Sequence, residues 1–241
     1  MTGEAHDPPL AARGPVDAAL REEHPGLYIR WLEVDHGSGR TPRELKRRLA
    51  ALSDRFGGPQ AIAFRTKPIP SAYRVFYRHI GLDPDTQLTP PEVIVRERML
   101  KGGFLSSNLL DDALTVAMIE SGVPVVAFDA DALAGPLGIR PSSAGEALEG
   151  RPGELPAGTL VIADEESPVA LLFGAIGTGR GVSPATRRTA LAAVGVAGVP
   201  EIAVEEALWL DGDHRGGVTN RCVPPPVAAI MVERDPEREP G

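Results

Sequence analysis

The chain has 241 residues, 42% of them hydrophobic, and a formal net charge of −8 at pH 7. It is long enough to bury a core of its own, and its single cysteine, Cys222, excludes an internal disulfide framework. The sequence has no apolar run of the roughly 18 residues that span a membrane and no leader of the secretory type at its start. We therefore expect a cytoplasmic protein without a membrane partner.

The first third of the chain predicts a lead-in, a helix, a strand and a second helix. Residues 1–14 show no hydrophobic period and are expected to be disordered. A short helix follows Pro15, and residues 27–34 are rich in strand-forming side chains. The motif Thr-Pro-Arg-Glu at 41–44 predicts a helix that Thr41 caps. Its buried stripe consists of Leu45, Leu49, Leu52 and Phe56.

Two further helices are predicted before residue 102. Residues 61–65 are predicted as a short strand, and Pro68 and Pro70 should keep the following link extended. Residues 71–80 predict an amphipathic helix that leaves Arg74 and Arg78 outside its apolar face. Tyrosines interleaved with arginines can stack on a nucleotide, although core packing is the commoner role for such tyrosines. Residues 89–92, Thr-Pro-Pro-Glu, repeat the capping signature of residues 41–44 and begin a helix that runs to Lys101.

The charge of this basic part contrasts with that of the remainder. Residues 40–101 carry 13 Lys and Arg against 6 Asp and Glu, whereas residues 102–241 carry 9 against 20. A basic segment in an acidic chain is suited to contact with phosphate, although such residues also commonly do no more than solvate helices. The candidate RNA-binding residues are Arg43, Arg47, Arg65, Arg74 and Arg78.

Residues 102–131 predict a loop, a helix, a turn and a strand. Ser107 or Asn108 caps the helix, and Gly122 ends it. Residues 123–128 form a short apolar run typical of a buried strand. Asn108, Asp111 and Asp112 crowd the first turn of the helix. Capping and the positive end of the helix dipole account for these polar groups, and a binding site is the alternative.

The second half predicts mainly strands. Residues 137–140 form a short strand, and residues 155–164 and 167–174 form a hairpin. The glycine-rich segment 174–181 lacks the spacing of a phosphate-binding or dinucleotide-binding loop, and is either a plain loop or a turn that approaches a ligand. Residues 189–196 fit a strand or a helix, and residues 200–210 predict an acidic helix.

The C-terminal residues complete the predicted organisation. Residues 15–212 are expected to form one domain, followed by a tail with a candidate edge strand at 227–232. Asp211, Asp213 and His214 are weak evidence for a metal site, because no second spaced cluster accompanies them. No metal and no cofactor are expected.

Five motifs follow one another in a specific order: residues 108–111, 121–131, 155–164, 168–170 and 174–177. This series resembles the B3/B4 domain of the phenylalanyl-tRNA synthetase beta subunit over about residues 61–208. The resemblance implies an α+β fold with helices around an internal β-sandwich-like core. It also implies contact with tRNA and a pocket that hydrolyses a wrongly attached amino acid, tyrosine in the synthetase, from the tRNA end. The other synthetase domains do not fit into 241 residues, so a freestanding relative is expected.

The resemblance also implies the residues of the pocket. Such hydrolysis needs a positioned water, a group that polarises it, and donors for the developing oxyanion. Glu205 lies roughly where the family has its pocket glutamate, and Gly174, Gly177 and Thr178 are the candidate donors. Asn108 lies beside the same pocket.

Two positions depart from the family's pattern. The family's pocket Asn is replaced by Leu114 or Thr115, and its His by Val126. Discrimination for a hydroxyl depends on paired hydrogen-bonding groups, so we expect this pocket not to bind tyrosine in the same way. A more apolar or smaller aminoacyl group is expected instead.

Two functions remain in competition at this point. The leading prediction is a tRNA-interacting domain that hydrolyses a misacylated aminoacyl-tRNA in trans. The alternative is a non-catalytic module that binds RNA or a small amino-acid-like ligand.

Overall fold

In the computed structural model, residues 11–35 and 37–208 are described. They form seven α-helices and two antiparallel sheets, which confirms the predicted α+β class. The helices are α1 (Ala18–Glu23), α2 (Arg43–Arg55), α3 (Gly58–Phe64), α4 (Pro68–His79), α5 (Pro90–Lys101), α6 (Leu109–Ser121) and α7 (Glu201–Leu208), with a 3-10 helix η1 at Ala130–Ala132. Sheet A contains, in spatial order, β1 (Ala12–Arg13), β2 (Tyr28–Val34), β7 (Thr189–Gly195) and β3 (Val125–Asp129). Sheet B contains β4 (Gly138–Pro141), β5 (Leu160–Ala163) and β6 (Pro168–Leu171).

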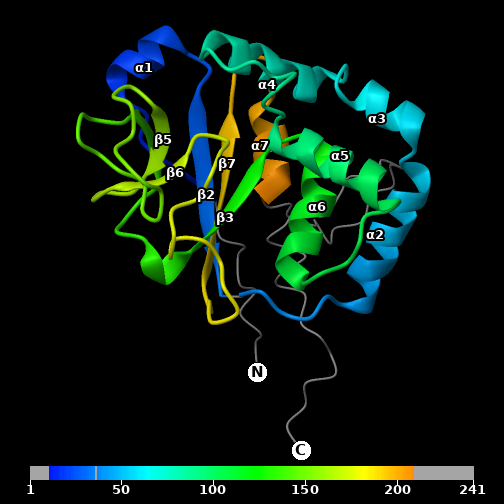
Figure 1. Cartoon of the computed structure of the whole chain (residues 1–241). Coiled ribbons are helices and arrows are strands. Elements are labelled where there is room, and N and C mark those ends of the chain that lie inside the picture. The colour runs from blue at the N-terminus through cyan, green and yellow to red at the C-terminus, as the bar shows by residue number, and fades with distance from the viewer. Residues whose placement is uncertain (1–10, 36, 209–241) are drawn as a thin grey trace, which may run out of the picture.

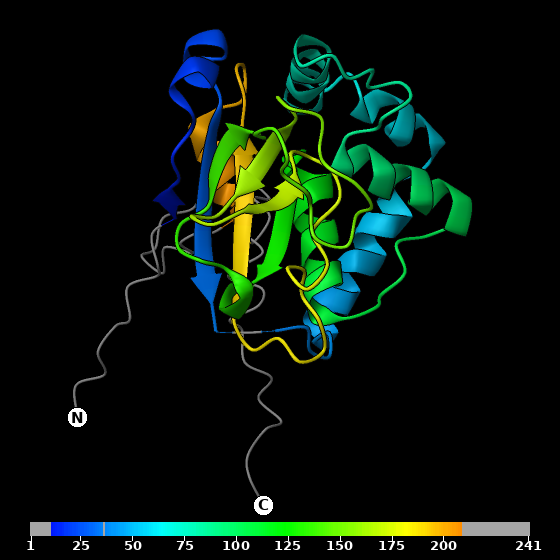
Figure 2. The same cartoon turned by 60° about the vertical axis from the view of Figure 1, so that its left-hand side comes forward.

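Sheet A stands in the middle of the molecule. Sheet B lies on one side of it, and helices α2, α5, α6 and α7 lie on the other (Figures 1 and 2). Strand β7 pairs with β2 and with β3, and all seven of its residues are buried. Because both faces of this strand are covered, it is apolar after Thr189 and shows no alternation. This explains why residues 189–196 could not be assigned from their period alone.

The helix boundaries follow from local chemistry where caps are present. The Glu92 side chain accepts hydrogen bonds from the backbone N–H and the hydroxyl of Thr89, which confirms the predicted cap of α5. Asn108 caps α6, since its Oδ1 accepts from the Asp111 N–H at 3.0 Å. Gly122 ends α6 at φ 77°, a left-handed conformation that favours glycine.

The predicted cap of α2 is wrong. Pro42 occupies the cap position and makes no side-chain cap, while the Thr41 hydroxyl donates to Asp112 Oδ2 at 2.6 Å. A buried carboxylate is a strong hydrogen-bond acceptor. The Thr41 hydroxyl therefore bonds to Asp112 of helix α6 and does not cap α2. The buried stripe of α2 is as predicted.

The strand predicted at 61–65 is also wrong, because these residues lie in and just after α3. Pro59 occupies the first turn, and Gln60 Oε1 accepts from the Gly57 N–H at 3.1 Å. Helix α4 begins at Pro68, so the link around Pro68 and Pro70 is helical and not extended. Proline loses no hydrogen bond in a first helical turn, where N–H groups have no partner within the helix.

The two ends of the described part complete the picture. Strand β1 lies within the predicted disordered lead-in, because Ala12 and Arg13 pair with Trp31 and Arg30 of β2. The tail at 213–241, the candidate strand at 227–232 and the residues Asp211, Asp213 and His214 lie outside the described residues. Within residues 11–35 and 37–208, no helix is long and apolar enough to cross a membrane. The same residues contain no group of three or more His, Cys, Asp or Glu that could hold a metal ion.

Candidate functional site

An apolar cavity of about 140 Å³ lies where sheets A and B meet. Sheet A contributes Val125, Val126, Ala192 and Val194, and sheet B contributes Ile162, Ala170 and Leu171. The remaining wall consists of Pro90, Pro124, Phe173, Gly174 and Ile176. None of these twelve residues has a polar side chain.

Strand register and small side chains create this space. Val126 lies opposite Ala192, so both side chains point to the side of sheet A that faces sheet B. Ala192 and Ala170 are 0% and 1% exposed. A methyl group at each of these positions leaves room that larger side chains would fill.

The turn after β6 forms one wall of the cavity. Phe173 has φ 57°, and within the described residues it is the sole non-glycine residue with a positive φ. Such a conformation costs a bulky residue on the order of 1–3 kcal/mol and persists where the surroundings impose it. The next residues of this turn, Gly174 and Ile176, are exposed, so the cavity opens to solvent here.

Aromatic side chains of α4 hold Phe173 in place. Its ring stacks on Tyr77 with 5.4 Å between centroids and meets Tyr73 edge-on at 5.9 Å. The Tyr73 hydroxyl donates to the Val194 carbonyl at 2.7 Å. Burial raises the pKa of both Tyr73 and Tyr77, so both remain neutral at physiological pH. These contacts therefore hold Phe173, and with it this wall of the cavity, in place.

Two of the predicted pocket residues, Val126 and Gly174, line this cavity. The backbone N–H groups predicted as oxyanion donors are already used. Gly174 donates to Leu171 at 3.0 Å, Gly177 to Val169 at 2.8 Å and Thr178 to Glu149 at 2.8 Å. The fold thus uses all three N–H groups, that of Thr178 toward the loop at Glu149, so none of them is free to act as an oxyanion donor.

Glu205 lies on the opposite face of sheet A. Its carboxylate pairs with Arg30 at 3.0 Å, and Arg30 also binds Glu201 at 2.6 Å. Arg30 adjoins Trp31, which lies opposite Ala192, so alternation along β2 points Arg30 away from the cavity. The prediction that Glu205 belongs to the pocket is wrong, because helix α7 packs on the far side of the sheet (Figure 1).

The predicted pocket residues of helix α6 have structural roles. Asn108 caps the helix and donates from Nδ2 to Asp111 Oδ2 at 2.7 Å. Leu114 packs partly buried against the hydrophobic core. Neither Asn108, Leu114 nor Thr115 is among the residues that line the cavity. The buried Asp112 accepts from Thr41 and from the Ser106 hydroxyl, both at 2.6 Å, so these polar groups support the helix.

Arg74 is buried, contrary to the prediction that it projects outward. Its guanidinium donates to Glu92 Oε1 at 2.7 Å and to Asp85 Oδ1 at 2.5 Å, and Arg65 donates to the same Glu92 oxygen at 2.9 Å. The hydrogen bond from Arg74 holds the pKa of the Asp85 carboxyl below its ordinary value. We refer to Arg65, Arg74, Asp85 and Glu92 as the α4–α5 ion cluster. It leaves Arg74 unavailable for RNA.

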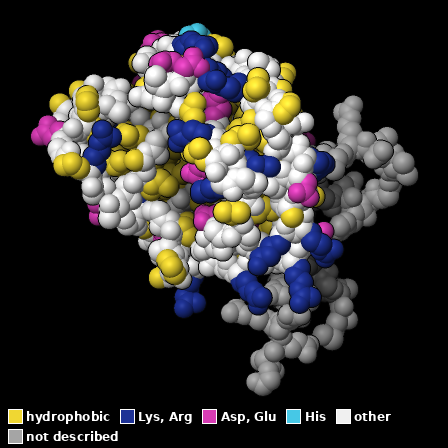
Figure 3. All heavy atoms as spheres, turned by 45° about the vertical axis from the view of Figure 1, so that its right-hand side comes forward, with side chains coloured by type: hydrophobic (Ala, Val, Ile, Leu, Met, Phe, Trp, Pro, Cys, Tyr) yellow, Lys and Arg dark blue, Asp and Glu magenta, His cyan; other side chains and the backbone are white. Residues whose placement is uncertain are grey.

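The other candidate RNA-binding residues are accessible to different degrees. Arg43, Arg47 and Arg78 are exposed, whereas the Arg65 side chain is 41% exposed and tied to the ion cluster. Lys46 is a further exposed basic residue on α2. Figure 3 shows the side of the molecule on which α2 lies, with Lys and Arg side chains gathered at its lower right. Arg43, Lys46 and Arg47 on the outer face of α2 are therefore among the accessible residues of the basic segment, as is Arg78 on α4.

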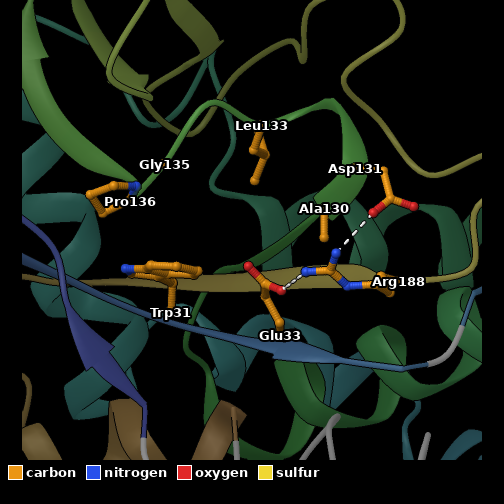
Figure 4. Close-up of a pocket in the computed structure, with 8 residues that line it drawn as sticks. All are labelled: Trp31, Glu33, Ala130, Asp131, Leu133, Gly135, Pro136 and Arg188. Carbon is orange, nitrogen blue, oxygen red and sulfur yellow. Dashed lines mark hydrogen bonds and ion pairs between the residues drawn. The ribbon is translucent and has the colours of Figure 1, made fainter.

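A second, polar cleft of about 450 Å³ lies at the other end of the strands. Arg188 is ion-paired with Glu33 and, at 3.0 Å, with Asp131. Figure 4 shows the two carboxylates pointing toward Arg188, with the Trp31 ring beside Pro136. The two carboxylates share the one guanidinium, which leaves a net charge of −1, and no charged side chain of the cleft is without a partner. The apolar cavity is therefore the better candidate site.

Sequence reasoning missed most of the cavity wall. Ile162, Ala170, Phe173 and Ala192 carry no chemical group that marks a site, and in a sequence they are indistinguishable from core residues. The run of small residues in β7 is the one signal that could have indicated a space beside the strand.

Comparison with known proteins identifies the family to which this chain belongs. Residues 72–205 match the family model described as the B3/4 domain. The phenylalanine–tRNA ligase beta subunit of Xanthomonas oryzae pv. oryzae (strain MAFF 311018) is 43% identical over 103 residues, which is 41% of this chain and 13% of that protein. The corresponding subunit of Xylella fastidiosa (strain Temecula1) is 40% identical over 94 residues, 38% of this chain and 12% of that protein. The chain thus matches about an eighth of the length of these relatives. Since the family model covers more than half of the chain, the protein belongs to the B3/4 domain family.

Proposed function

We propose that this protein binds aminoacylated tRNA and hydrolyses the ester of a wrongly attached amino acid, whose side chain occupies the cavity between the sheets. The cavity is the observation that carries this proposal. Four of the five segments whose order resembles the family contribute to its lining, through Val126, Ile162, Ala170 and Gly174 among others. The relatives are named as beta subunits of phenylalanine–tRNA ligase, which supports a tRNA as the partner.

The chemistry that this site can contribute is binding and orientation. No ionisable side chain lines the cavity, so the protein would hold the side chain and fix the ester at the open rim near Gly174 and Ile176. The free hydroxyl beside the ester on the terminal ribose would polarise the attacking water. Water adds to the ester carbonyl carbon, the bond to the ribose oxygen breaks, and that oxygen takes up a proton. The products are the free amino acid and uncharged tRNA.

The outer face of α2 is the proposed contact with the tRNA backbone. Arg43, Lys46 and Arg47 project from this helix, and the Arg47 side chain is 75% exposed. Lysine and arginine side chains bind phosphates through charge and release counterions in doing so. A local basic face allows an RNA contact despite a net charge of −8.

A deacylation assay tests the proposal directly. The protein is incubated with a panel of tRNAs charged with labelled correct and incorrect amino acids, and release of the label is followed. We expect release above the uncatalysed rate for at least one misacylated tRNA. An Arg43→Glu, Arg47→Glu double variant should slow this release, whereas Arg151→Glu, at an exposed arginine far along the chain in the loop before β5, is the control. Absence of release from every member of the panel would rule out the hydrolytic activity.

A non-catalytic binding module is the second candidate. It is favoured by the apolar lining and by the engaged N–H groups of Gly174, Gly177 and Thr178. Titration of labelled tRNA at several salt concentrations separates the two. Affinity that falls steeply with salt, without ester cleavage, would identify the binding module.

A further inference from the structure

We infer that the cavity between the sheets selects an apolar amino-acid side chain no larger than a phenyl ring and rejects a side chain that carries a hydroxyl. The inference specifies the substrate class of the site proposed above. It rests on that proposal for the identity of the ester, but the selectivity itself is a binding property and can be measured without hydrolysis.

The size of the cavity sets the upper limit. Its volume of about 140 Å³ is close to that of an apolar protein cavity of about 150 Å³ that binds benzene. A phenyl ring or a branched aliphatic side chain therefore fits. An indole ring requires the wall to move.

The wall is held against such movement. Phe173 is fixed by Tyr77 and Tyr73, with ring centroids 5.4 and 5.9 Å away. Ala192 and Val194 belong to the central, fully buried strand β7. A preformed site of this kind gains affinity for a ligand that fits and does not adapt to one that exceeds it.

The lining offers no partner to a hydroxyl. All twelve lining residues have apolar side chains or none. Two tyrosines pack against Phe173 without lining the cavity: the Tyr73 hydroxyl donates to the Val194 carbonyl, and the Tyr77 hydroxyl is buried without a hydrogen-bond partner. At Leu171 the N–H donates to Ala175 at 2.9 Å, and the carbonyl accepts from Gly174 at 3.0 Å. Both backbone groups of Leu171 are thus used by the turn.

A phenolic hydroxyl in this cavity would lose its hydrogen bonds to water and gain none. The expected discrimination between a phenyl and a hydroxyphenyl side chain is about tenfold to a hundredfold in affinity. Val126 is the position at which one substitution can change this. Threonine has the shape of valine but carries a hydroxyl in place of one methyl group. Val126→Thr therefore supplies a hydrogen-bond partner for a phenolic hydroxyl with little change in volume.

The experiment uses non-hydrolysable probes, adenosine derivatives that carry phenylalanine, tyrosine, leucine or tryptophan through an amide in place of the ester. Dissociation constants are measured by calorimetry or by ligand-detected NMR. We expect the phenylalanine and leucine probes to bind at least about tenfold more tightly than the tyrosine probe, and the tryptophan probe to bind most weakly. Equal or tighter binding of the tyrosine probe, or no binding by any of the four, would overturn the inference.

Val126→Thr should narrow the difference between the phenylalanine and tyrosine probes. Val182→Thr is the matched control, because Val182 is also half-buried but does not line the cavity. An unchanged ratio in a folded Val126→Thr protein counts against the cavity as the binding site. If either variant fails to fold, the four probes on the unmodified protein still decide the matter.

The deacylation panel separates this inference from the proposed function. Probe selectivity without release of any amino acid would retain the inference and remove the hydrolytic function. Release of tyrosine from tRNA as fast as release of phenylalanine would retain the function and remove the inference.

Discussion

The apolar cavity adjoins the buried pair of the α4–α5 ion cluster, Arg74 and Glu92, since Pro90 lines the cavity and the neighbouring Thr89 binds Glu92. In the cluster, Arg74 and Glu92 satisfy each other and leave no space. In the cavity there is space but no polar side chain. Buried charges are tolerated where they are paired, so the charged residues build the frame while apolar residues form the candidate site. Arg74, which looked functional by its charge, is thus structural.

Breaking the ion cluster should give the largest effect. Glu92→Ala removes the buried carboxylate of the cluster, leaves Arg74 with the exposed Asp85 as its remaining carboxylate partner, and removes the acceptor of the Thr89 hydrogen bonds. We expect a loss of about 3–5 kcal/mol in the free energy of unfolding, measured by urea denaturation. Glu97→Ala is the matched control on the same helix, because Glu97 forms an exposed pair with Lys101 at 2.9 Å and should cost less than about 0.5 kcal/mol. A loss below about 1 kcal/mol for Glu92→Ala would mean that the cluster is not structural.

Asp164 is a buried carboxylate beside sheet B, which contributes to the cavity wall. Its substitution should have an intermediate effect on the free energy of unfolding. Its side chain is fully buried in the β5–β6 turn and accepts from the N–H groups of Ala134, Glu166 and Ser167 at 2.8–3.0 Å and from Arg180. Burial acts to raise the pKa of Asp164, but these backbone hydrogen bonds outweigh it and lower the pKa. We expect Asp164→Asn to cost about 1–3 kcal/mol at pH 7.

The pH dependence of that effect has a definite sign. The folded pKa of Asp164 lies below the unfolded value of about 3.9, so between the two the unfolded state binds more protons. The contribution of Asp164 is therefore complete above that value and is lost as pH falls through the folded pKa. Denaturation curves at pH 7, 4 and 3 should show the difference between the unmodified protein and Asp164→Asn shrinking below about pH 4. A difference that stays constant would show that ionisation of Asp164 contributes nothing.

Substitution of Glu205, on the face of sheet A opposite the cavity, should have the smallest effect on the free energy of unfolding. Because Arg30 keeps Glu201 as a partner at 2.6 Å, Glu205→Ala should cost less than about 1 kcal/mol in stability. Its deacylation rate should equal that of the unmodified protein and of Glu201→Ala. A tenfold or larger fall in Glu205→Ala alone would place this carboxylate at the reacting ester after all.

Local chemistry was sufficient for several elements. The capped starts of α5 and α6, the glycine that ends α6 and the hairpin of β5 and β6 depend on residues close together in the chain. Residues 61–65 were misassigned because a short apolar run fits a strand or a helix equally well. Strand β1 was missed because its hydrogen bonds go to Trp31 and Arg30, which no local pattern indicates.

The candidate site was predictable only in part, through Val126 and Gly174. Glu205 was misplaced because the face of sheet A on which α7 packs is decided by partners far apart in sequence, Arg30 and Glu205. Arg74 was misplaced because its partners Asp85 and Glu92 come from a following loop and helix. The cavity itself is a gap between two sheets.

By itself, the sequence determined the α+β class, most helix boundaries and, through the order of its motifs, membership of the B3/4 domain family. These properties reside in caps, turns and periodic apolar residues, which act over a few positions. Only the tertiary structure decided which polar residues are used to hold the fold together and where space remains. Val126, Ala170 and Ala192 border a cavity because of the register of the strands and the spacing of the two sheets. Register and spacing are set by the packing of segments that are far apart in the sequence.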